Sequence, residues 1–525
     1  MSATPRRATL GTSAAPFDTL AQAQTASDSG DTLYVHDGND TSSGYDAGID
    51  LKSNQRLLGE AATLQVGADV LQSADSSKRP TITDNNADVV SLASGNTVRA
   101  VQLDPANNGG GIAGGAGDSG GTIDDVRIID SGTGGAQPDL ELDGTSGAFD
   151  ISGLTIDDAG SGAGSIGVRL NNNSGTVNFQ SVGTISITTN GARGLDAAGT
   201  NMGAASVFDA IAVTNSASGA VSMVNTSGTT SLGDGIGGDL SLQTTAGATS
   251  AFLLSNAGNV TVPGGGTANV GATGGPAIDV TGTGGASLSF DTVESMSSSS
   301  DAINLDGLGS GTFNATGGTL SGAGGIAFDF NGGSGSVSYG GAITNGTGQS
   351  AEITNRAGAA VTLSGSITDN NDAGGGITLA GNSGGSTTFS NTSKVINTTA
   401  GGDAVLMSSS DGHTLTFSGG GLDIDTATGR GLEASNSGTL VVSGPDNSIV
   451  TTTGTALSVV STDFGGAGAT FERIAAGTAA AGPVSGIVLN GTGVAGGLSV
   501  TGSGGACTVA VATCTGGTRV SGFLG

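Results

Sequence analysis

The chain has 525 residues, of which 100 are glycine, and a formal net charge of −29 that comes from 15 lysine and arginine residues against 44 aspartate and glutamate residues. A surface this acidic repels phosphate backbones and anionic lipid head groups, so it argues against nucleic-acid binding. No stretch approaches about 18 apolar residues, so we expect no transmembrane helix in this chain. The charge either keeps a long surface soluble or, alternatively, takes up divalent cations between acidic loops.

The N-terminal part is predicted to cap a repetitive fold. Residues 1–15 are expected to be a disordered lead, and 16–26 a short amphipathic helix with Phe17, Leu20 and Ala21 on one face. Short strands follow up to 145 and form the first irregular rungs. A glycine-rich insertion at about 105–122 lacks apolar pairs and is expected to loop out.

A four-residue pattern then recurs through 146–503: a small residue, an apolar residue, any residue, and an apolar or small residue. Successive copies start 23 to 31 residues apart, at Gly167, Gly194, Ala220, Ala251, Ala277, Ala302, Ala327, Ser350, Gly376, Ala404, Gly431, Ala456 and Gly486. A period of this size marks a repeat architecture. It argues against the disorder that so much glycine otherwise suggests.

Each repeat contains more than one strand. A second apolar set appears about eleven residues after the first, as at Leu288 and Val361, and a third set includes Ile343 and Ile367. Three short strands per repeat describe one rung of a parallel β-helix, with Ile278, Ile303 and Phe328 stacked in its core. Glycine and asparagine are expected at the corners, where a positive φ is required.

The predicted fold is therefore all-β: a right-handed, single-stranded parallel β-helix of about 25 residues per rung with a short N-terminal helix. Handedness follows from the strong preference of parallel strands for right-handed crossovers.

The C-terminal segment, 504–525, contains the only two cysteines, Cys507 and Cys514. Their spacing predicts a local disulfide that closes a short loop, with two free thiols as the alternative. A disulfide would imply an oxidising, exported setting. The first seven residues are not followed by the apolar core of a signal peptide, so a cytoplasmic protein is one alternative. We favour an excised or mature piece of an exported protein, because a ribosomal start rarely falls so close to a folded cap.

The opening segment resembles the start of pectate-lyase-like, right-handed parallel β-helix proteins. The residues that carry this resemblance lie at 16–23, 30–35, 49–53 and 56–59. In that superfamily such a block forms the capping helix and the first rungs. The glycine-, threonine- and serine-rich coils beyond it look like those of large bacterial surface proteins, including autotransporter passengers and adhesins. The superfamily also contains polysaccharide lyases and hydrolases, so the resemblance does not choose the function.

An acidic stripe is expected on the outer face of the first strands, at Asp279, Asn304, Asp329 and Glu352. It is interpreted as a polar face that discourages lateral sheet association, with sugar or calcium contact as the alternative. Turn formation is favoured over calcium binding at 37–40 and 369–372. No cofactor is predicted, and calcium stays open as an alternative.

The basic and histidine residues give no catalytic pattern. Arg169, Arg193, Arg356 and Arg430 are expected to lie apart from phased carboxylates, with Arg193 and Arg430 solvated at corners. His36 and His413 are far apart in the sequence and suggest no catalytic pair. Three tyrosines and no tryptophan leave few platforms for stacking sugar rings.

We therefore expect a noncatalytic protein that is secreted or displayed at a bacterial cell surface and associated with the outer membrane. It would act as a stiff, adhesin-like or passenger-like rod attached to an anchor or barrel domain outside this chain. Its expected partner is a glycan or surface protein of a host cell or the environment, met by the 105–122 insertion and the acidic stripe. The alternatives are a polysaccharide lyase or glycoside hydrolase of the same fold, and a structural spacer of a surface layer.

Overall fold

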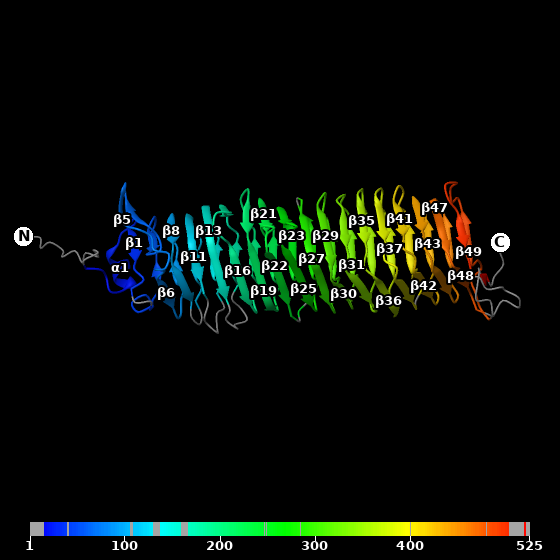
Figure 1. The fold of residues 1–525 in the computed structure, drawn as a ribbon, viewed down its shortest axis with the longest axis horizontal. Coiled ribbons are helices and arrows are strands. Elements are labelled where there is room, and N and C mark those ends of the chain that lie inside the picture. Colours follow the sequence, from blue (N-terminus) through cyan, green and yellow to red (C-terminus); the bar gives the residue numbers. More distant parts are fainter. Residues whose placement is uncertain are drawn as a thin grey trace, which may run out of the picture. The chain divides into compact units, whose positions relative to one another are not determined.

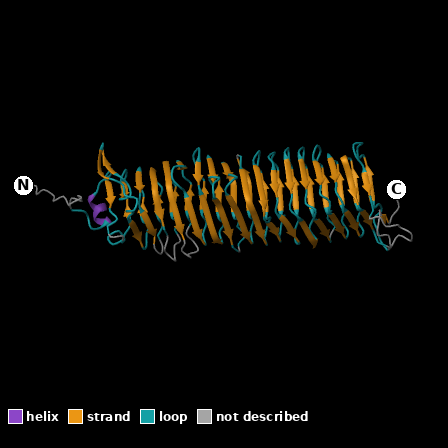
Figure 2. Ribbon diagram, viewed as in Figure 1, coloured by secondary structure: helices purple, strands orange, loops and turns teal. Residues whose placement is uncertain are grey.

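The computed structural model describes residues 15–38, 41–105, 109–129, 137–158, 166–245, 247, 249–283, 285–399, 401–478, 480–502 and 519–520. The chain divides into two compact units: Met1–Gln243 with Ala257–Gly266 is unit 1, and Thr244–Asn256 with Thr267–Gly525 is unit 2. Within each unit the chain winds through successive turns of short strands (Figures 1 and 2). No helix in the described part is long and apolar enough to cross a bilayer.

The fold is an all-β parallel β-solenoid, and the units together contain about 17 turns of ~26 residues. The winding has the sense of a right-handed β-helix. The fold class and repeat length predicted from the sequence are therefore confirmed. Helix is confined, among the described residues, to α1 (Leu20–Ala26), which is shorter than the predicted 16–26 because Thr19 caps it by accepting a hydrogen bond from the Gln22 N–H.

The first strand of each turn carries the four-residue repeat and pairs only with the first strands of neighbouring turns. In unit 1 these strands are β2 (Ile49–Asp50), β7 (Val90–Ser91), β10 (Ile112–Gly114), β12 (Leu140–Asp143), β14 (Val168–Asn171), β17 (Leu195–Ala198) and β20 (Val221–Val224). In unit 2 they are β23 (Phe252–Ala257), β26 (Ile278–Thr283), β28 (Ile303–Asp306), β31 (Phe328–Asn331), β34 (Ala351–Thr354), β37 (Ile377–Ala380), β40 (Val405–Ser408), β43 (Leu432–Ser435), β46 (Leu457–Val460) and β49 (Ile487–Asn490).

The second and third strands of the turns form the other wall, and in some turns they merge into one long strand. In unit 1 they are β1 (Thr32–Val35), β3 (Arg56–Gly59), β6 (Thr81–Asp84), β8 (Asn96–Arg99), β9 (Gln102–Pro105), β11 (Ser119–Ile128), β13 (Ser146–Asp158), β15 (Thr176–Phe179), β16 (Ser186–Asn190), β18 (Ser206–Phe208), β19 (Ala210–Ser216), β21 (Thr229–Leu232), β22 (Gly238–Thr244) and β24 (Asn259–Val262).

In unit 2 the corresponding strands are β25 (Thr267–Thr273), β27 (Ser287–Met296), β29 (Thr312–Gly317), β30 (Thr319–Ser321), β32 (Val337–Tyr339), β33 (Ala342–Asn345), β35 (Ala360–Leu363), β36 (Ile367–Asp372), β38 (Ser386–Phe389), β39 (Lys394–Thr398), β41 (Thr414–Phe417), β42 (Leu422–Thr426), β44 (Thr439–Val442), β45 (Ser448–Thr451), β47 (Asp463–Phe471), β48 (Arg473–Ala476), β50 (Leu498–Val500) and β51 (Arg519–Val520). A separate antiparallel hairpin, β4 (Leu64–Val66) and β5 (Asp69–Gln72), was not predicted.

The core consists of inward-facing apolar columns that run across the turns. Ile278 pairs in register with Ile303, and Ile303 pairs with Phe328, as predicted, and all three side chains are fully buried. Because side chains alternate along a strand, the residues between the buried ones point outward. One turn cannot bury its own inward row, so its stability comes from the turns above and below it.

The corner after the first strand is built the same way in all thirteen repeats that start between Gly167 and Gly486. The residue five positions after the start of each repeat has a φ between 47° and 74°: Asn172, Gly199, Asn225, Asn256, Gly282, Gly307, Gly332, Asn355, Gly381, Ser409, Asn436, Ser461 and Gly491. Asparagine and glycine dominate because they tolerate the left-handed region. The predicted role of these residue types at corners is confirmed at this column.

The expectation that about 105–122 loops out is wrong for the described residues. Ile112 lies in β10, is fully buried and pairs with Val90 of β7 and Leu140 of β12, while β11 starts at Ser119. The segment follows the same small–apolar pattern as the later repeats. Gly111 is needed at its start because a Cβ there would lie 2.5 Å from the carbonyl oxygen of Asp139.

The left-handed corner gives a direct test of the fold. Asn436 is exposed and has a φ of 47°. Replacing it with valine should lower the free energy of unfolding by about 1–2 kcal/mol, because a β-branched residue is strained in this region. Asn436→Gly is the matched control and should change it by only a few tenths of a kcal/mol. Urea unfolding followed by circular dichroism measures both, and equal stability of the two variants would contradict the assignment.

Candidate functional site

The four residues of the predicted acidic stripe lie side by side on neighbouring first strands. Asp279 of β26 pairs in register with Asn304 of β28, Asn304 with Asp329 of β31, and Asp329 with Glu352 of β34. Their strand neighbours Ile278, Ile303 and Phe328 are buried, so these four side chains point outward. We call this column the acidic ladder. Its predicted placement is confirmed, and its role as a ligand surface stays a prediction.

The first half of the acidic ladder is internally hydrogen-bonded. The Asn304 Nδ2 donates to Asp279 Oδ1 at 2.9 Å, and the Ser250 hydroxyl donates to Asp279 Oδ2 at 3.1 Å. Asn304 therefore separates the Asp279 and Asp329 charges and satisfies one of them. This placement of an amide between two carboxylates lowers the repulsion along the column.

A second outward column runs beside the ladder. Asn331 donates from Nδ2 to Asp306 Oδ1 at 3.1 Å, and its own Oδ1 accepts from the Thr354 hydroxyl at 3.1 Å and from Asn355 Nδ2 at 2.8 Å. These bonds join three successive turns through side chains. They hold the amide and hydroxyl groups in fixed positions next to Asp329 and Glu352.

The two columns border a shallow, polar groove in unit 2. Its volume is about 370 Å³, and it is lined by Asp329, Asn331, Glu352, Thr354, Asn355, Ala380 and Gly381. The charged groups that act on Asp329 are all acids, namely Asp301, Glu352 and Asp306. The groove therefore presents hydrogen-bond acceptors without a cation that would neutralise them.

The carboxyl group of Asp329 is electrostatically unusual. Partial burial, followed by the nearby charges of Asp301, Glu352 and Asp306, raises the pKa of Asp329 from 3.8 to about 7. Asp329 therefore exchanges a proton near neutral pH, and it can donate a hydrogen bond when it is protonated. A protonated Asp329 next to an acidic residue on the adjacent turn, Glu352, is an arrangement that can perform acid–base chemistry. The same pair can also donate and accept hydrogen bonds with the hydroxyl groups of a ligand.

The prediction that the arginines lie apart from phased carboxylates is wrong for three of them. Arg169 lies 3.1 Å from Glu141, its in-register partner on the previous first strand, and Arg193 lies 2.6 Å from Asp196. Arg430 contacts Asp403 at 3.1 Å and Glu433. The corner positions of Arg193 and Arg430 bring their guanidinium groups onto the first-strand face, so neither is merely solvated.

Arg356 is buried rather than catalytic or solvated. Its guanidinium group donates to the carbonyl oxygens of Gly332 at 2.9 Å and Gly358 at 2.9 Å, and lies 4.1 Å from the centre of the Phe330 ring. Burial lowers the pKa of Arg356 to about 10. The side chain fills the corner next to Gly333, where a Cβ would approach it. No sequence signal separates this arginine from a surface one.

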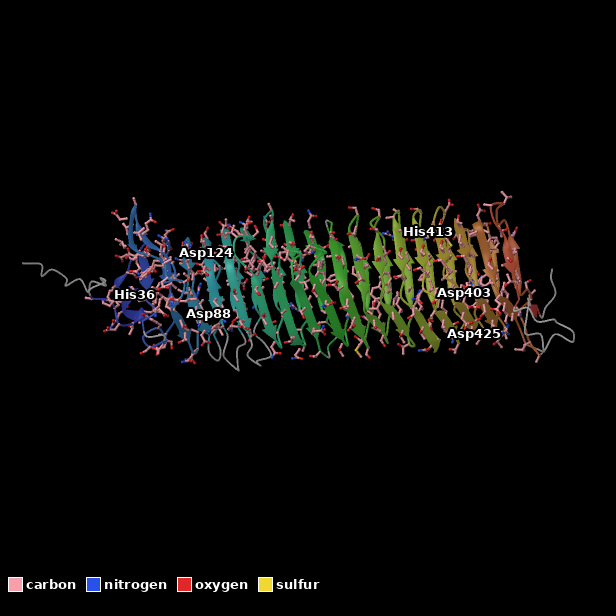
Figure 3. The ribbon with its side chains drawn as sticks, viewed as in Figure 1. His36, Asp88, Asp124, Asp403, His413 and Asp425 are labelled. Carbon is pink, nitrogen blue, oxygen red and sulfur yellow. The ribbon has the colours of Figure 1, made fainter. Side chains whose placement is uncertain are left out.

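Two further titratable groups are buried without a catalytic partner. Lys394 donates to the carbonyl oxygens of Asn391, Ser418 and Gly420, and burial lowers its pKa to about 8. His413 (Figure 3) places Nδ1 2.8 Å from the Gly384 carbonyl oxygen, so Nδ1 carries the proton and Nε2 accepts from the Thr387 hydroxyl at 3.0 Å. Burial lowers the pKa of His413. Both residues satisfy backbone groups at corners.

The segments considered for calcium form no cation cage among the described residues. Asp369 is buried and accepts a hydrogen bond from the Ser350 hydroxyl at 3.1 Å, while the backbone of 369–372 continues β36. Residues 39 and 40 lie outside the described residues, as do Cys507 and Cys514 of the predicted disulfide and the 1–14 part of the predicted lead.

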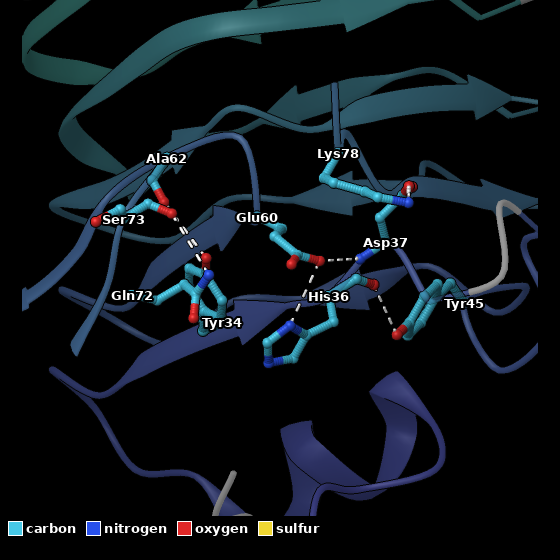
Figure 4. Close-up of polar contacts among 9 residues, drawn as sticks. All are labelled: Tyr34, His36, Asp37, Tyr45, Glu60, Ala62, Gln72, Ser73 and Lys78. Carbon is cyan, nitrogen blue, oxygen red and sulfur yellow. Dashed lines mark hydrogen bonds and ion pairs between the residues drawn. The ribbon is translucent and has the colours of Figure 1, made fainter. Parts of the chain in front are cut away.

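His36 is not isolated in space, although it is isolated in the sequence. It lies within a cluster at the N-terminal end of unit 1 with Tyr34, Tyr45 and Glu60 (Figure 4). Two of the three tyrosines of the chain meet there. Tyr34 and His36 lie two residues apart at β1, so strand alternation indicates that they share a face, whereas the contacts with Tyr45 and Glu60 bring in residues from a loop and from the end of the next strand.

Comparisons with protein-family models, with curated protein sequences and with solved structures find no match for this chain.

The raised pKa of Asp329 predicts a pH-dependent stability. The folded protein binds a proton at Asp329 that the unfolded chain releases between pH 3.8 and about 7, so this group destabilises the fold increasingly as the pH rises through that window. Asp329→Asn should therefore raise the free energy of unfolding at pH 8 by about 1–2 kcal/mol, after allowance for solvent screening, and change it little at pH 4.

Thermal unfolding of both proteins at the two pH values measures this difference. Asp411→Asn, at an exposed turn of unit 2, is the charge-matched control. A stabilisation by Asp329→Asn that is the same at pH 4 and pH 8 would contradict the assignment.

Proposed function

We propose that this chain is a noncatalytic, exported solenoid of the adhesin or autotransporter-passenger type, displayed at a bacterial cell surface. In this role the solenoid presents a fixed outer face to a partner surface. The similarity of residues 16–59 to the first rungs of pectate-lyase-like proteins and the coil composition support this proposal. The fold is compatible with it but does not select it.

The observation that carries the proposal is the acidic ladder with its groove. Outward residues on adjacent turns are about 4.8 Å apart and keep this spacing because the strands are paired in register. The charged groups that act on Asp329 are all acids, and Asn331, Thr354 and Asn355 beside it form hydrogen bonds to each other or to Asp306. Each acceptor in this rigid, shallow array would bind weakly, and an extended partner that contacts several of them at once would bind with a higher total affinity.

The chemistry of the groove favours a neutral glycan as the partner. Carboxylate and amide oxygens accept hydrogen bonds from sugar hydroxyls, whereas uronates and sialic acids would meet like charge. Multivalent display on a cell would raise the avidity of such weak contacts.

The basic residues support a noncatalytic role. Lyases of the resembled superfamily use arginine or lysine as the base, but Arg169, Arg193 and Arg430 are paired with carboxylates. Arg356 and Lys394 are buried against backbone carbonyls. None of these cations lines the groove.

A binding experiment tests the proposal. Wild-type protein immobilised at high density should retain neutral glycans on an array. Glu352→Ala combined with Asn331→Ala should reduce retention about tenfold, because the first removes an acceptor from the groove and the second removes the amide that holds Thr354 and Asn355 in place. Asp411→Asn should retain the wild-type level. Undiminished binding by the double variant, or binding confined to acidic glycans, would contradict the proposal.

A glycoside hydrolase is the second candidate, and one observation favours it. Asp329 and Glu352 are in-register neighbours, and the pKa of Asp329 is raised to about 7. Retaining glycosidases use two carboxyl groups about 5–5.5 Å apart, one of them with a raised pKa as the acid. Adjacent turns of a solenoid provide about this spacing.

Incubation with a panel of neutral polysaccharides distinguishes the two functions. The noncatalytic proposal expects no release of reducing ends by the wild-type protein at pH 5 to 8. Release that is abolished by both Asp329→Asn and Glu352→Gln, and retained by Asp411→Asn, would establish the hydrolase and overturn the noncatalytic role.

A further inference from the structure

A second groove lies at the N-terminal end of unit 1, between α1 and β1. Its volume is about 520 Å³. One wall is formed by Phe17, Leu20 and Ala23 in and before the helix, and Tyr45 and Leu64 close its sides. This volume lies in the range of ligand-binding pockets, and the walls are mainly apolar.

The opposite wall is the edge of β1 rather than one of its faces. All five consecutive residues at 32–36 line the groove, although side chains alternate along a strand. Leu33 and Val35 are buried, whereas Thr32 and His36 are exposed. A surface that reaches five consecutive residues must include their backbone, so backbone N–H and C=O groups border the groove.

The pairing of β1 agrees with this geometry. β1 is paired in parallel with β3 from Thr32↔Arg56 to Val35↔Gly59, and β3 is its one strand partner among the described residues. A strand paired on one side presents alternate backbone groups on the other. In this groove those groups border the same open space as the apolar side chains of α1, and an exposed strand edge is what the addition of a peptide strand requires.

Polar side chains around the groove already have partners, most of them backbone groups (Figure 4). The Tyr34 hydroxyl donates to the Ala62 carbonyl oxygen at 3.4 Å, and the Tyr45 hydroxyl donates to the His36 carbonyl oxygen at 3.0 Å. Glu60 Oε2 lies 3.4 Å from His36 Nδ1 and accepts from the Asp37 N–H at 3.0 Å.

These contacts decide between two ligand classes. A sugar needs side-chain donors and acceptors that are free to meet its hydroxyls, but both tyrosine hydroxyls and Glu60 are already hydrogen-bonded or paired. Burial and the nearby Glu60 charge raise the pKa of Tyr34, so its hydroxyl remains a donor to Ala62. The groove presents a strand edge between apolar walls. The strand edge can form hydrogen bonds with the backbone of an extended peptide, and the apolar walls can contact its alternate side chains.

We propose that the groove between α1 and β1 binds an extended, non-acidic peptide segment of a partner protein, which adds as a strand to the edge of β1 that has no strand partner among the described residues. Alternate side chains of the peptide enter the apolar space beside Leu20 and Leu33, and the others pass Tyr45 and His36. Acidic residues are disfavoured by Glu60 and by the net charge of −29. This site goes beyond the proposed glycan-binding face, belongs to unit 1 and does not depend on it.

The experiment uses the full chain and a fluorescent probe peptide, Lys-Thr-Val-Thr-Val-Thr-Lys, acetylated and amidated at its ends. Binding is measured by fluorescence anisotropy, and amide hydrogen exchange of 32–36 is followed with and without the peptide. Two further peptides carry N-methyl groups on alternate amides, one on each edge of the strand. We expect binding, slower exchange at 32–36, and loss of binding for one methylated peptide but not the other.

Two matched protein variants locate the site. Ala23 lines the groove, whereas Ala21 is exposed on the same helix and does not. Ala23→Trp should weaken peptide binding at least about tenfold by filling the groove, and Ala21→Trp should leave it within about twofold. Equal thermal unfolding midpoints of the two variants show that the helix is intact.

Four results would overturn the proposal. Three of them are the absence of peptide binding, equal binding by both N-methylated peptides, and equal affinity of the Ala23→Trp and Ala21→Trp variants. The fourth is peptide binding that appears only after deletion of residues 2–14, which would assign the groove to the chain's own N-terminal residues. Saturation-transfer NMR with methyl glycosides tests the other ligand class. If the wild-type protein gives a signal with a glycoside but does not bind the peptide, and the Ala23→Trp variant loses that signal, the groove binds a sugar instead.

Discussion

Parallel pairing between consecutive turns is the interaction on which everything else in this protein depends. The inward apolar side chains of a turn, such as Ile278, are buried only because the neighbouring turns cover them. The backbone of each strand forms its hydrogen bonds with strands about one repeat away in the sequence. In-register pairing places equivalent residues of successive turns directly beside one another. The left-handed corner therefore recurs at the same position of successive turns. This explains why the corner column consists almost entirely of glycine and asparagine, which tolerate a positive φ.

The same stacking concentrates charge and must compensate for it. Where an amide lies between two carboxylates, as Asn304 does between Asp279 and Asp329, the column is stabilised by hydrogen bonds. Asp329 is partly buried and lies near Asp301, Glu352 and Asp306, and these surroundings raise its pKa to about 7. Buried cations solve a different problem, because Arg356 and Lys394 satisfy carbonyl oxygens that the corners leave without a backbone partner.

The two proposed binding regions use different consequences of one architecture. The acidic ladder is a product of repetition, since outward side chains on successive turns form an ordered array. The groove at β1 depends on an edge rather than on repetition, since β1 is paired on one side only among the described residues. A solenoid thus offers side chains along its length and backbone groups at a strand edge, and the two surfaces select partners of different chemistry.

The sequence by itself determined the repeat, the parallel β-solenoid, the stacking of Ile278, Ile303 and Phe328, and the outward column from Asp279 to Glu352, because phase within a repeat is conserved when turns stack in register. The strand at Ile112 was hidden by surrounding glycines. Arg430 contacts Asp403 of the previous turn because each lies one position before the start of a repeat, so the repeat phase did carry a signal for this pair. The burial of Arg356 and the cluster of Tyr34, His36, Tyr45 and Glu60 were decided by tertiary structure alone, since side-chain direction at an irregular corner or cap follows from packing and not from periodicity.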